Sequence, residues 1–208
     1  MSLYGRVFAA IYDRMMAGTE RAGLGERRQR LLAQARGRVL EIGAGTGANL
    51  EHYPAGVAEL VLTEPEEPMA RRLAQRVSRL GRPAQVVHAS AESLPFEDSS
   101  FDTVVSTLVL CTVRDPERTL DEVARVLRPG GRLLFLEHVR SDDPRLARWQ
   151  DRLRGPWSAF GHGCNCNRPT PALIDASTLE LETIEHGSMP KAPAIVRPLA
   201  VGQATARG

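Results

Sequence analysis

Residues 39–50 read VLEIGAGTGANL, an apolar run that passes directly into three glycines spaced two residues apart. Residues 38–42 predict a strand. Gly43, Gly45 and Gly47 predict a sharp turn from that strand into a helix, because glycine lets the backbone bend tightly and approach a ligand. In open α/β sheets, ligands bind at the carboxyl ends of the strands where the strand order reverses. The stretch therefore predicts a nucleotide-type site in an α/β fold.

Apolar runs and amphipathic stretches alternate on the carboxyl side of this segment. The pattern predicts strands at 60–63, 85–88, 101–110 and 132–138, a turn at 128–131, and helices at 69–80, 115–127 and 169–177. Asp115 and Pro116 supply an N-cap and a proline at the first helical position. This rhythm is typical of a parallel, doubly wound sheet. Residues 179–186 and 194–204 are expected to close the sheet as a hairpin.

The chain length suits one domain built around a single core, so residues 1–208 are expected to form one domain. We expect a helical N-terminal segment at 1–37 and a cofactor-binding core at 38–140. A helical insert at 141–178, around Trp149 and Trp157, is expected to cover the substrate. Closing strands are expected at 179–208.

The composition argues against several classes of partner. With 27 basic and 25 acidic residues, the net charge of +2 gives no electrostatic case for nucleic acid. The arginine pairs at 27–28 and 71–72 have acidic neighbours and are interpreted as solvated helix faces. Arg6, Asp13 and Arg14 make the first residues neither a secretory signal nor a transmembrane span. Three cysteines give no disulfide framework, so a cytoplasmic location is expected.

Acidic residues flank the glycine stretch on both sides. Glu64 comes about twenty residues after Gly43, where a carboxylate can accept hydrogen bonds from ribose hydroxyls. Residues 43–48 also satisfy the G-x-G-x-x-A dinucleotide fingerprint, so an NAD-dependent enzyme is the competing interpretation. Glu41 disfavours it, because a carboxylate just before the glycines suits a cationic sulfonium better than a pyrophosphate. Gly47 also disfavours it, because it lies one place earlier than that fingerprint requires.

Residues 39–138 resemble the class I methyltransferases that use S-adenosylmethionine (SAM), of the ubiquinone/menaquinone-biosynthesis type. The matching pieces are VLEIGAGTGANL at 39–50, SAESLPFEDSSFDTVV at 90–105 and EVARVLRPGGRLLFLEH at 122–138. The resemblance implies a Rossmann-like α/β fold with a seven-stranded, mostly parallel sheet that ends in an antiparallel C-terminal hairpin. It also implies SAM as the cofactor.

The resemblance assigns roles to individual residues. Tyr12 lies in VFAAIYD, which is similar to the family's N-terminal tyrosine motif, and is implied to cover the methionine end of SAM. The family usually has Asp where this chain has Ser90, so the bond to the adenine amino group comes either from Ser90 or from backbone. The other implied contacts are Glu41, Gly43, Ala44, Gly45 and Asn49 at the methionyl part, Glu64 at the ribose, Pro65, Met69, Ala91 and Glu92 at the adenine, and Thr107 and Leu108 after the fourth strand.

Segments outside this core resemble a narrower group, the alkyl thiol S-methyltransferases and their bacterial relatives. They are TLVLCTV at 107–113, EHV at 137–139, WQ at 149–150, PW at 156–157, and GCN with a following arginine at 163–168. This similarity implies a small lipophilic thiol as the methyl acceptor. The group's apolar N-terminal membrane segment has no counterpart in the sequence, so no membrane span is expected.

Two histidines are candidates for the general base, since a thiol is a few per cent ionised at neutral pH and needs only one ordinary base. His138 follows the fifth expected strand, where it could instead cap the strand end. His162 lies after the tryptophan-containing helix, where it could instead be a surface residue. Cys111 is read as a small buried hydrophobe. Cys164, Cys166 and His162 lie too close together for a structural zinc site, so no metal is expected.

Other functions stay open on the same residues. An O-, N- or C-methyltransferase acting on a small molecule fits the core equally well. A SAM-binding module without catalysis is disfavoured by the expected insert over the substrate. The sequence leaves the acceptor, the base and the oligomeric state open.

Overall fold

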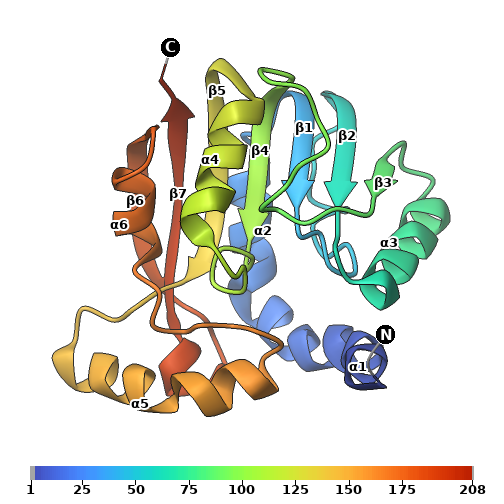
Figure 1. The fold of residues 1–208 in the computed structure, drawn as a ribbon. Helices are drawn as coiled ribbons and strands as arrows, with labels where there is room; N and C mark the ends of the chain where they lie inside the picture. The colour runs from blue at the N-terminus through green and yellow to red at the C-terminus, as the bar shows by residue number, and fades with distance from the viewer. Residues whose placement is uncertain (1–2, 208) are drawn as a thin grey trace.

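The computed structural model describes residues 3–207 and contains one seven-stranded sheet (Figure 1). The strand order is β3-β2-β1-β4-β5-β7-β6. The strands are β1 (Gly37–Ile42), β2 (Val57–Thr63), β3 (Gln85–Val87), β4 (Phe101–Thr107), β5 (Leu127–His138), β6 (Leu179–Ser188) and β7 (Pro198–Ala206). The first five strands are parallel, and β7 pairs antiparallel with both β5 and β6. The expected sheet with its antiparallel C-terminal hairpin is confirmed.

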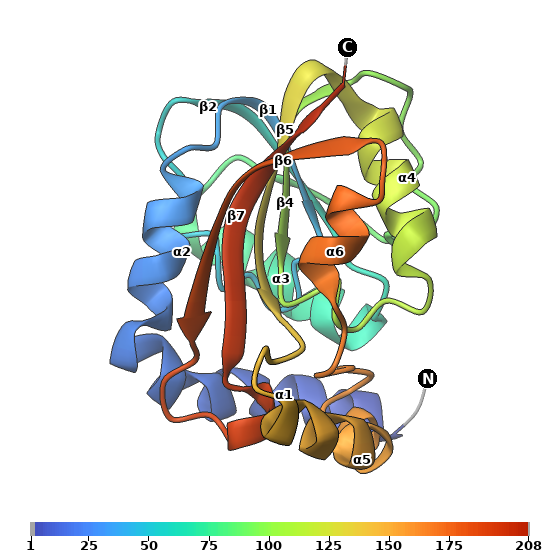
Figure 2. The ribbon, with the colours of Figure 1, turned by 90° about the vertical axis from the view of Figure 1, so that its left-hand side faces the viewer.

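Helices cover both faces of the sheet and one of its ends. Figure 2 shows α2 on one face, α4 and α6 on the other, and α1 and α5 across the end. The helices are α1 (Leu3–Thr19), α2 (Gly25–Leu32), α3 (Glu67–Leu80), α4 (Pro116–Val126), α5 (Pro144–Phe160) and α6 (Thr170–Asp175). A π-helical turn, η1 (Glu20–Leu24), joins α1 to α2, and a 3₁₀ turn, η2 (Ala194–Val196), precedes β7.

Two hydrophobic clusters occupy the two faces of the sheet. Successive residues of β4 point to opposite faces, so Val104 packs with Leu120 of α4 while Val105 packs with Leu32 of α2 and Leu73 of α3. A strand buried on both faces explains the uncharged run after Asp102. Asp115 caps α4 by accepting a hydrogen bond from the Arg118 amide at 3.0 Å, as its sequence predicts.

Four local expectations were wrong. The last strand begins at Pro198 rather than residue 194, because residues 194–196 form a 3₁₀ turn. No helix follows the glycines. Residues 45–52 form successive turns instead, and Gly43 and Gly47 have φ values of +56° and +85°. The expected turn at 128–131 is the irregular start of β5, because Leu127 already pairs with Phe101 and the register shifts beyond it. Strand β4 ends at Thr107 rather than residue 110, because Leu108 has a left-handed φ of +61°.

Candidate active site

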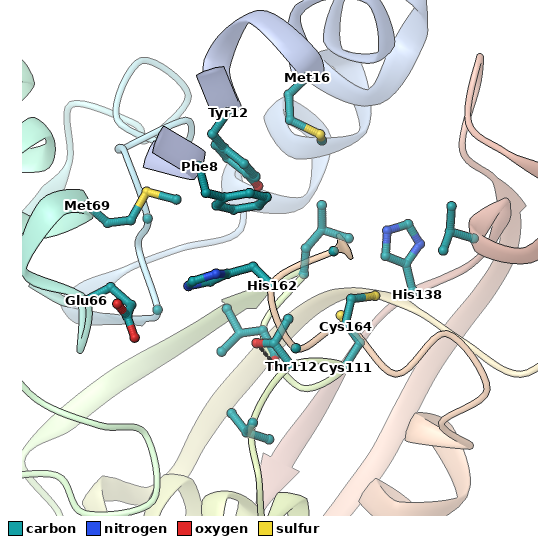
Figure 3. Close-up of a pocket in the computed structure, with 18 of the residues that line it drawn as sticks. Phe8, Tyr12, Met16, Glu66, Met69, Cys111, Thr112, His138, His162 and Cys164 are labelled. Carbon is teal, nitrogen blue, oxygen red and sulfur yellow. Dashed lines mark hydrogen bonds between the residues drawn. The ribbon is translucent and has the colours of Figure 1, made fainter. Parts of the chain in front are cut away.

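A cavity of about 1010 Å³ is lined by residues that follow the parallel strands and by residues of α1 and α5. Figure 3 shows Glu66 and Met69 at one end and His138, Cys111 and Cys164 at the other. Phe8, Tyr12 and His162 lie between them. Pockets that bind one drug-sized ligand have volumes of roughly 300–1,000 Å³. The cavity is at the upper end of this range, which leaves room for a small molecule beside a cofactor.

The glycine loop forms one wall of the cavity with backbone rather than side chains. Gly43 and Gly45 both line the cavity with left-handed φ values of +56° and +58°. A Cβ on Gly43 would lie 2.8 Å from both methyl groups of Val109, whereas a Cβ on Gly45 would meet nothing within 4 Å. The open space over Gly45 faces the cavity, so a ligand can approach the main chain closely here.

Glu64 stands at the end of β2 and is held by two backbone amides. Its Oε2 accepts from Gly45 N at 2.8 Å and its Oε1 accepts from Glu66 N at 2.9 Å. Burial raises the pKa of this carboxyl, and the two amide hydrogen bonds partly offset the shift. A carboxylate has about four acceptor sites, so each oxygen can still accept one further hydrogen bond from a ligand hydroxyl.

Ser90 and Glu92 also line the cavity. The Ser90 hydroxyl donates to the Glu92 carboxylate, which also accepts from the Arg114 amide at 2.9 Å. The Ser90 oxygen keeps acceptor capacity toward the cavity. Ser90 can thus replace the aspartate that the family usually has as an acceptor for an amino group.

A buried polar network lies behind the glycine loop. Glu41 accepts from Tyr53 at 2.7 Å and from the Asn49 amide at 2.9 Å, and Asn49 also donates to Thr107. One guanidinium nitrogen of Arg28 donates to both Asn49 and Thr107, at 2.9 and 3.0 Å. Burial raises the pKa of Glu41 to about 7, against the lowering effect of its hydrogen bonds and of Arg28.

The interpretation of Arg28 as part of a solvated helix face was wrong. The residue is only 3% exposed and its Nε also bonds to Glu20 at 3.1 Å. Sequence offered a signal, because Leu24, Arg28 and Leu32 are spaced four apart and share one helical stripe. An arginine on an otherwise apolar stripe is often paired inside the protein.

Most of the expected cofactor-binding residues line the cavity. They are Tyr12, Gly43, Gly45, Glu64, Pro65, Met69, Ser90, Ala91, Glu92 and Leu108. Four others do not form its wall. Glu41, Asn49 and Thr107 belong to the network behind the loop, and Ala44 packs into the core.

Glu137 fixes the wall that follows β4, and sequence analysis assigned it no role of its own. Its carboxylate accepts from the Ser106 hydroxyl and from the amides of Val109, Leu110 and Cys111, at 2.7 to 3.3 Å. Burial raises the pKa of this carboxyl. Arg168 holds the same segment from the other side by donating to the Leu110 carbonyl. The segment is therefore rigidly positioned.

The far end of the cavity is neutral and rich in sulfur. The thiols of Cys111 and Cys164 are hydrogen-bonded to each other, which raises the pKa of Cys111 and lowers that of Cys164. Burial lowers the pKa of His138 to about 4, and its Nδ1 has no hydrogen-bond partner among the described residues. Met16, Trp157, Met189 and Val196 also line the cavity, and with Cys111, Cys164 and His138 they form what we call the acceptor chamber; Lys191, near Met189 in sequence, lines the cavity as well.

An aromatic stack crosses the middle of the cavity. The rings of Phe8 and His162 stack with centroids 4.7 Å apart, so helix α1 touches the loop that follows α5. Tyr12 lies one helical turn beyond Phe8, and burial raises its pKa to about 12. Both candidate bases, His138 and His162, thus line one cavity from different elements.

The described residues also limit other kinds of site. None of the helices between residues 3 and 207 has the length and apolar character needed to cross a bilayer. Over the same residues, no three His, Cys, Asp or Glu side chains are grouped as metal ligands.

Comparisons with known proteins identify the family. A family model described as "Methyltransferase domain" matches residues 40–135. Over 95% of its length, the chain is 33% identical to human thiol S-methyltransferase TMT1A, and the match covers 82% of that protein. It is 37% identical to a demethylmenaquinone methyltransferase from Clavibacter sepedonicus, over 55% of this chain and 46% of that one.

Solved structures support the same conclusion. A SAM-dependent methyltransferase from Thermotoga maritima, described as a possible histamine N-methyltransferase, superposes with a TM-score of 0.72 at 25% identity. The match covers 97% of each chain. SAM is therefore the cofactor, and the dinucleotide alternative is excluded. The chain belongs to the class I SAM-dependent methyltransferases.

Proposed function

We propose that this methyltransferase methylates the sulfur of a small lipophilic thiol. The observation that carries the proposal is the acceptor chamber, whose lining of aromatic, methionine, cysteine and aliphatic side chains has no carboxylate to pair with a cationic acceptor. A cationic amine would be desolvated there without a counterion, which is costly. The identity with a thiol S-methyltransferase supports the same acceptor.

Several of the expected contacts with SAM have a physical basis in this cavity. We propose that Glu64 accepts hydrogen bonds from the ribose hydroxyls, and that Ser90 meets the adenine amino group. The Gly43–Gly45 backbone and the network through Asn49 are proposed to hold the methionyl part. When bound, SAM supplies an electrophilic methyl group on a positively charged sulfur. The protein then has to hold a deprotonated sulfur in line with that methyl and exclude water.

The two histidines differ in what they can do as bases. Moving a proton from a thiol of pKa ~8.5 to an imidazole of pKa ~4 is uphill by about 6 kcal/mol. Forming the thiolate at pH 7 without a base is uphill by only about 2 kcal/mol. His138 is thus the weaker candidate, despite its unpartnered Nδ1. We assign the base to His162, with His138 as a neutral wall that orients the acceptor.

Turnover of a matched panel tests the acceptor. An alkyl thiol, a phenol and a primary amine with the same apolar group would be incubated with methyl-labelled SAM, and product measured by mass spectrometry. We expect the thiol to react fastest and the amine not at all. Good turnover of the phenol with none of the thiol would replace the proposal by O-methylation, and a methylated quinol carbon would indicate C-methylation as in the demethylmenaquinone relative.

A pH series separates a base from a structural histidine. His162→Asn should lower turnover at pH 7 by at least about tenfold while leaving SAM affinity unchanged. At pH 9 the thiol ionises unaided, so the defect should largely disappear. A defect of equal size at both pH values would show that His162 positions the acceptor without taking its proton. His138→Asn is the matched comparison and should show no rescue at pH 9.

A further inference from the structure

Large apolar side chains are exposed mainly on two helices. Of the eight large hydrophobic residues exposed in the described part of the chain, six lie on α1 and α5. Those on α1 are Val7, Ile11 and Met15, and those on α5 are Trp149, Leu153 and Phe160. Trp149 and Phe160 are 54% and 58% exposed. Both helices lie across the same end of the molecule (Figures 1 and 2). We call this surface the α1–α5 face.

The exposed apolar residues form stripes rather than isolated points. Residues 7, 11 and 15 of α1 recur every four positions and therefore share one side of the helix. Residues 149, 153 and 160 of α5 are spaced by four and seven positions and also share one side of their helix, while Ala147 and Gln150 are buried against the body of the protein. Two helices thus each bury one side in the protein and present an apolar stripe outward.

Positive charge is concentrated on the same two helices. They contain six arginines, at 6, 14, 145, 148, 152 and 154, and two aspartates, at 13 and 151. Asp151 is bound to Arg140 and Asn167, and Asp13 receives a hydrogen bond from Thr46. The two helices therefore carry +4 in a chain whose net charge is +2, so the rest of the chain is net negative.

Arginines flank the exposed apolar side chains of α5. Arg148 and Arg152 are neighbours of Trp149 and Leu153 in sequence, and the Arg152 guanidinium lies 5.8 Å from the Trp149 ring centroid. Arginine beside aromatic side chains also occurs in protein–protein interfaces, so the excess of positive charge on these two helices is the observation that favours an anionic bilayer. Helices that lie in the bilayer interface combine Trp, Phe and Leu with Arg, whose charged end reaches the headgroups.

From these observations we propose that the α1–α5 face docks on the surface of an anionic lipid bilayer. Apolar side chains enter the headgroup–acyl boundary, and the arginines pair with anionic headgroups. Met15 and Phe160 belong to this face and also line the cavity, so the cavity opens where the bilayer would lie. A lipophilic acceptor could then enter from the membrane. That entry route rests on the proposed function, whereas the docking does not.

Co-sedimentation with vesicles tests the docking. The probe is vesicles of phosphatidylcholine with phosphatidylglycerol, compared with phosphatidylcholine alone, at about 0.1 M salt and at several times that concentration. We expect binding to the anionic vesicles that weakens as salt rises. Trp149→Glu/Leu153→Glu should reduce it at least about tenfold. Neither residue lines the cavity, so SAM affinity measured by calorimetry should stay unchanged.

A matched control separates the effect of the substituted site from the effect of adding two negative charges. Leu80→Glu/Ile184→Glu adds the same two negative charges at exposed apolar sites outside the face and should bind vesicles nearly as the unaltered protein does. Equal loss in both double variants, or no binding of the unaltered protein to anionic vesicles, would overturn the proposal. So would a lipid-free dimer, seen by sedimentation velocity, that only Trp149→Glu/Leu153→Glu disrupts. That result would make the face a protein interface.

Discussion

Replacing Gly45 by alanine tests separately what this glycine contributes to the stability of the protein and to the binding of SAM. Gly45 has φ +58°, and an added Cβ meets nothing within 4 Å. The variant should therefore lose only the cost of holding an L-residue in the left-handed region, about 1–2 kcal/mol. For a chain of this size, that corresponds to a fall in Tm of roughly 2–8 °C. The empty space that tolerates the methyl group is, however, where the cofactor is expected to meet the backbone.

Gly81→Ala is the matched control. Gly81 ends α3 with φ +61° and also has nothing within 4 Å of an added Cβ, but it does not line the cavity. Both variants should lose similar stability without ligand. At a SAM concentration near 100 Kd, the unaltered protein and Gly81→Ala should gain about 2.7 kcal/mol from binding. A tenfold weaker Kd would cut that gain to about 1.4 kcal/mol in Gly45→Ala.

Thermal melts with and without SAM, together with calorimetric titration, provide the measurement. Equal SAM-induced Tm shifts in the two variants would refute the assignment of Gly45 to the cofactor site. A much larger loss of stability in Gly45→Ala than in Gly81→Ala without SAM would instead contradict the geometry of the loop.

Four further predictions concern buried groups. Because burial raises the pKa of Glu41 to about 7, the free energy of unfolding should fall by about 3 kcal/mol as the pH rises from 4.5 to 7. In urea titrations, Glu41→Gln should remove this pH dependence. Burial lowers the pKa of His138 to about 4, so this residue has the opposite effect, and the free energy of unfolding should fall as the pH drops from 6.5 to 4. His138→Phe should abolish that loss. Arg28→Met should cost roughly 3–5 kcal/mol because it leaves buried partners unpaired, whereas Arg27→Met, which breaks an exposed pair, should cost less than about 1 kcal/mol. In peptide mapping after brief alkylation, the Cys164 thiol, whose pKa is lowered, should be modified first, and prior addition of an acceptor thiol should slow the reaction.

The local pattern of apolar and polar residues was sufficient to predict the sheet and most of the helices. Strand β4 could be predicted because its β-branched residues are buried on both faces, and α4 because Asp115 and Pro116 mark its start. The same kind of signal failed after Gly43, where three glycines with positive φ replace the expected helix by turns. Local propensity could not predict the turns, because glycine adopts positive and negative φ values at similar cost.

The cofactor end of the site was more predictable than the acceptor chamber. Gly45 and Glu64 follow neighbouring parallel strands, so topology alone brings them together. The hydrogen-bonded thiols of Cys111 and Cys164 come from segments more than fifty residues apart, and the contact of Phe8 with His162 joins α1 to the loop that follows α5. Such contacts depend on packing between elements, which residue spacing does not specify.

The carboxylate of Glu137 has a consequence for protein engineering. Its hydrogen bonds go to the main-chain amides of residues 109–111 and not to their side chains. The backbone path of this wall is therefore held by a residue of β5, whereas the side chains on the wall belong to the segment that follows β4. Randomising the side chain at Cys111 should alter the size and polarity of the chamber while its backbone stays in place. Acceptor range could then diverge rapidly among relatives that keep the glutamate.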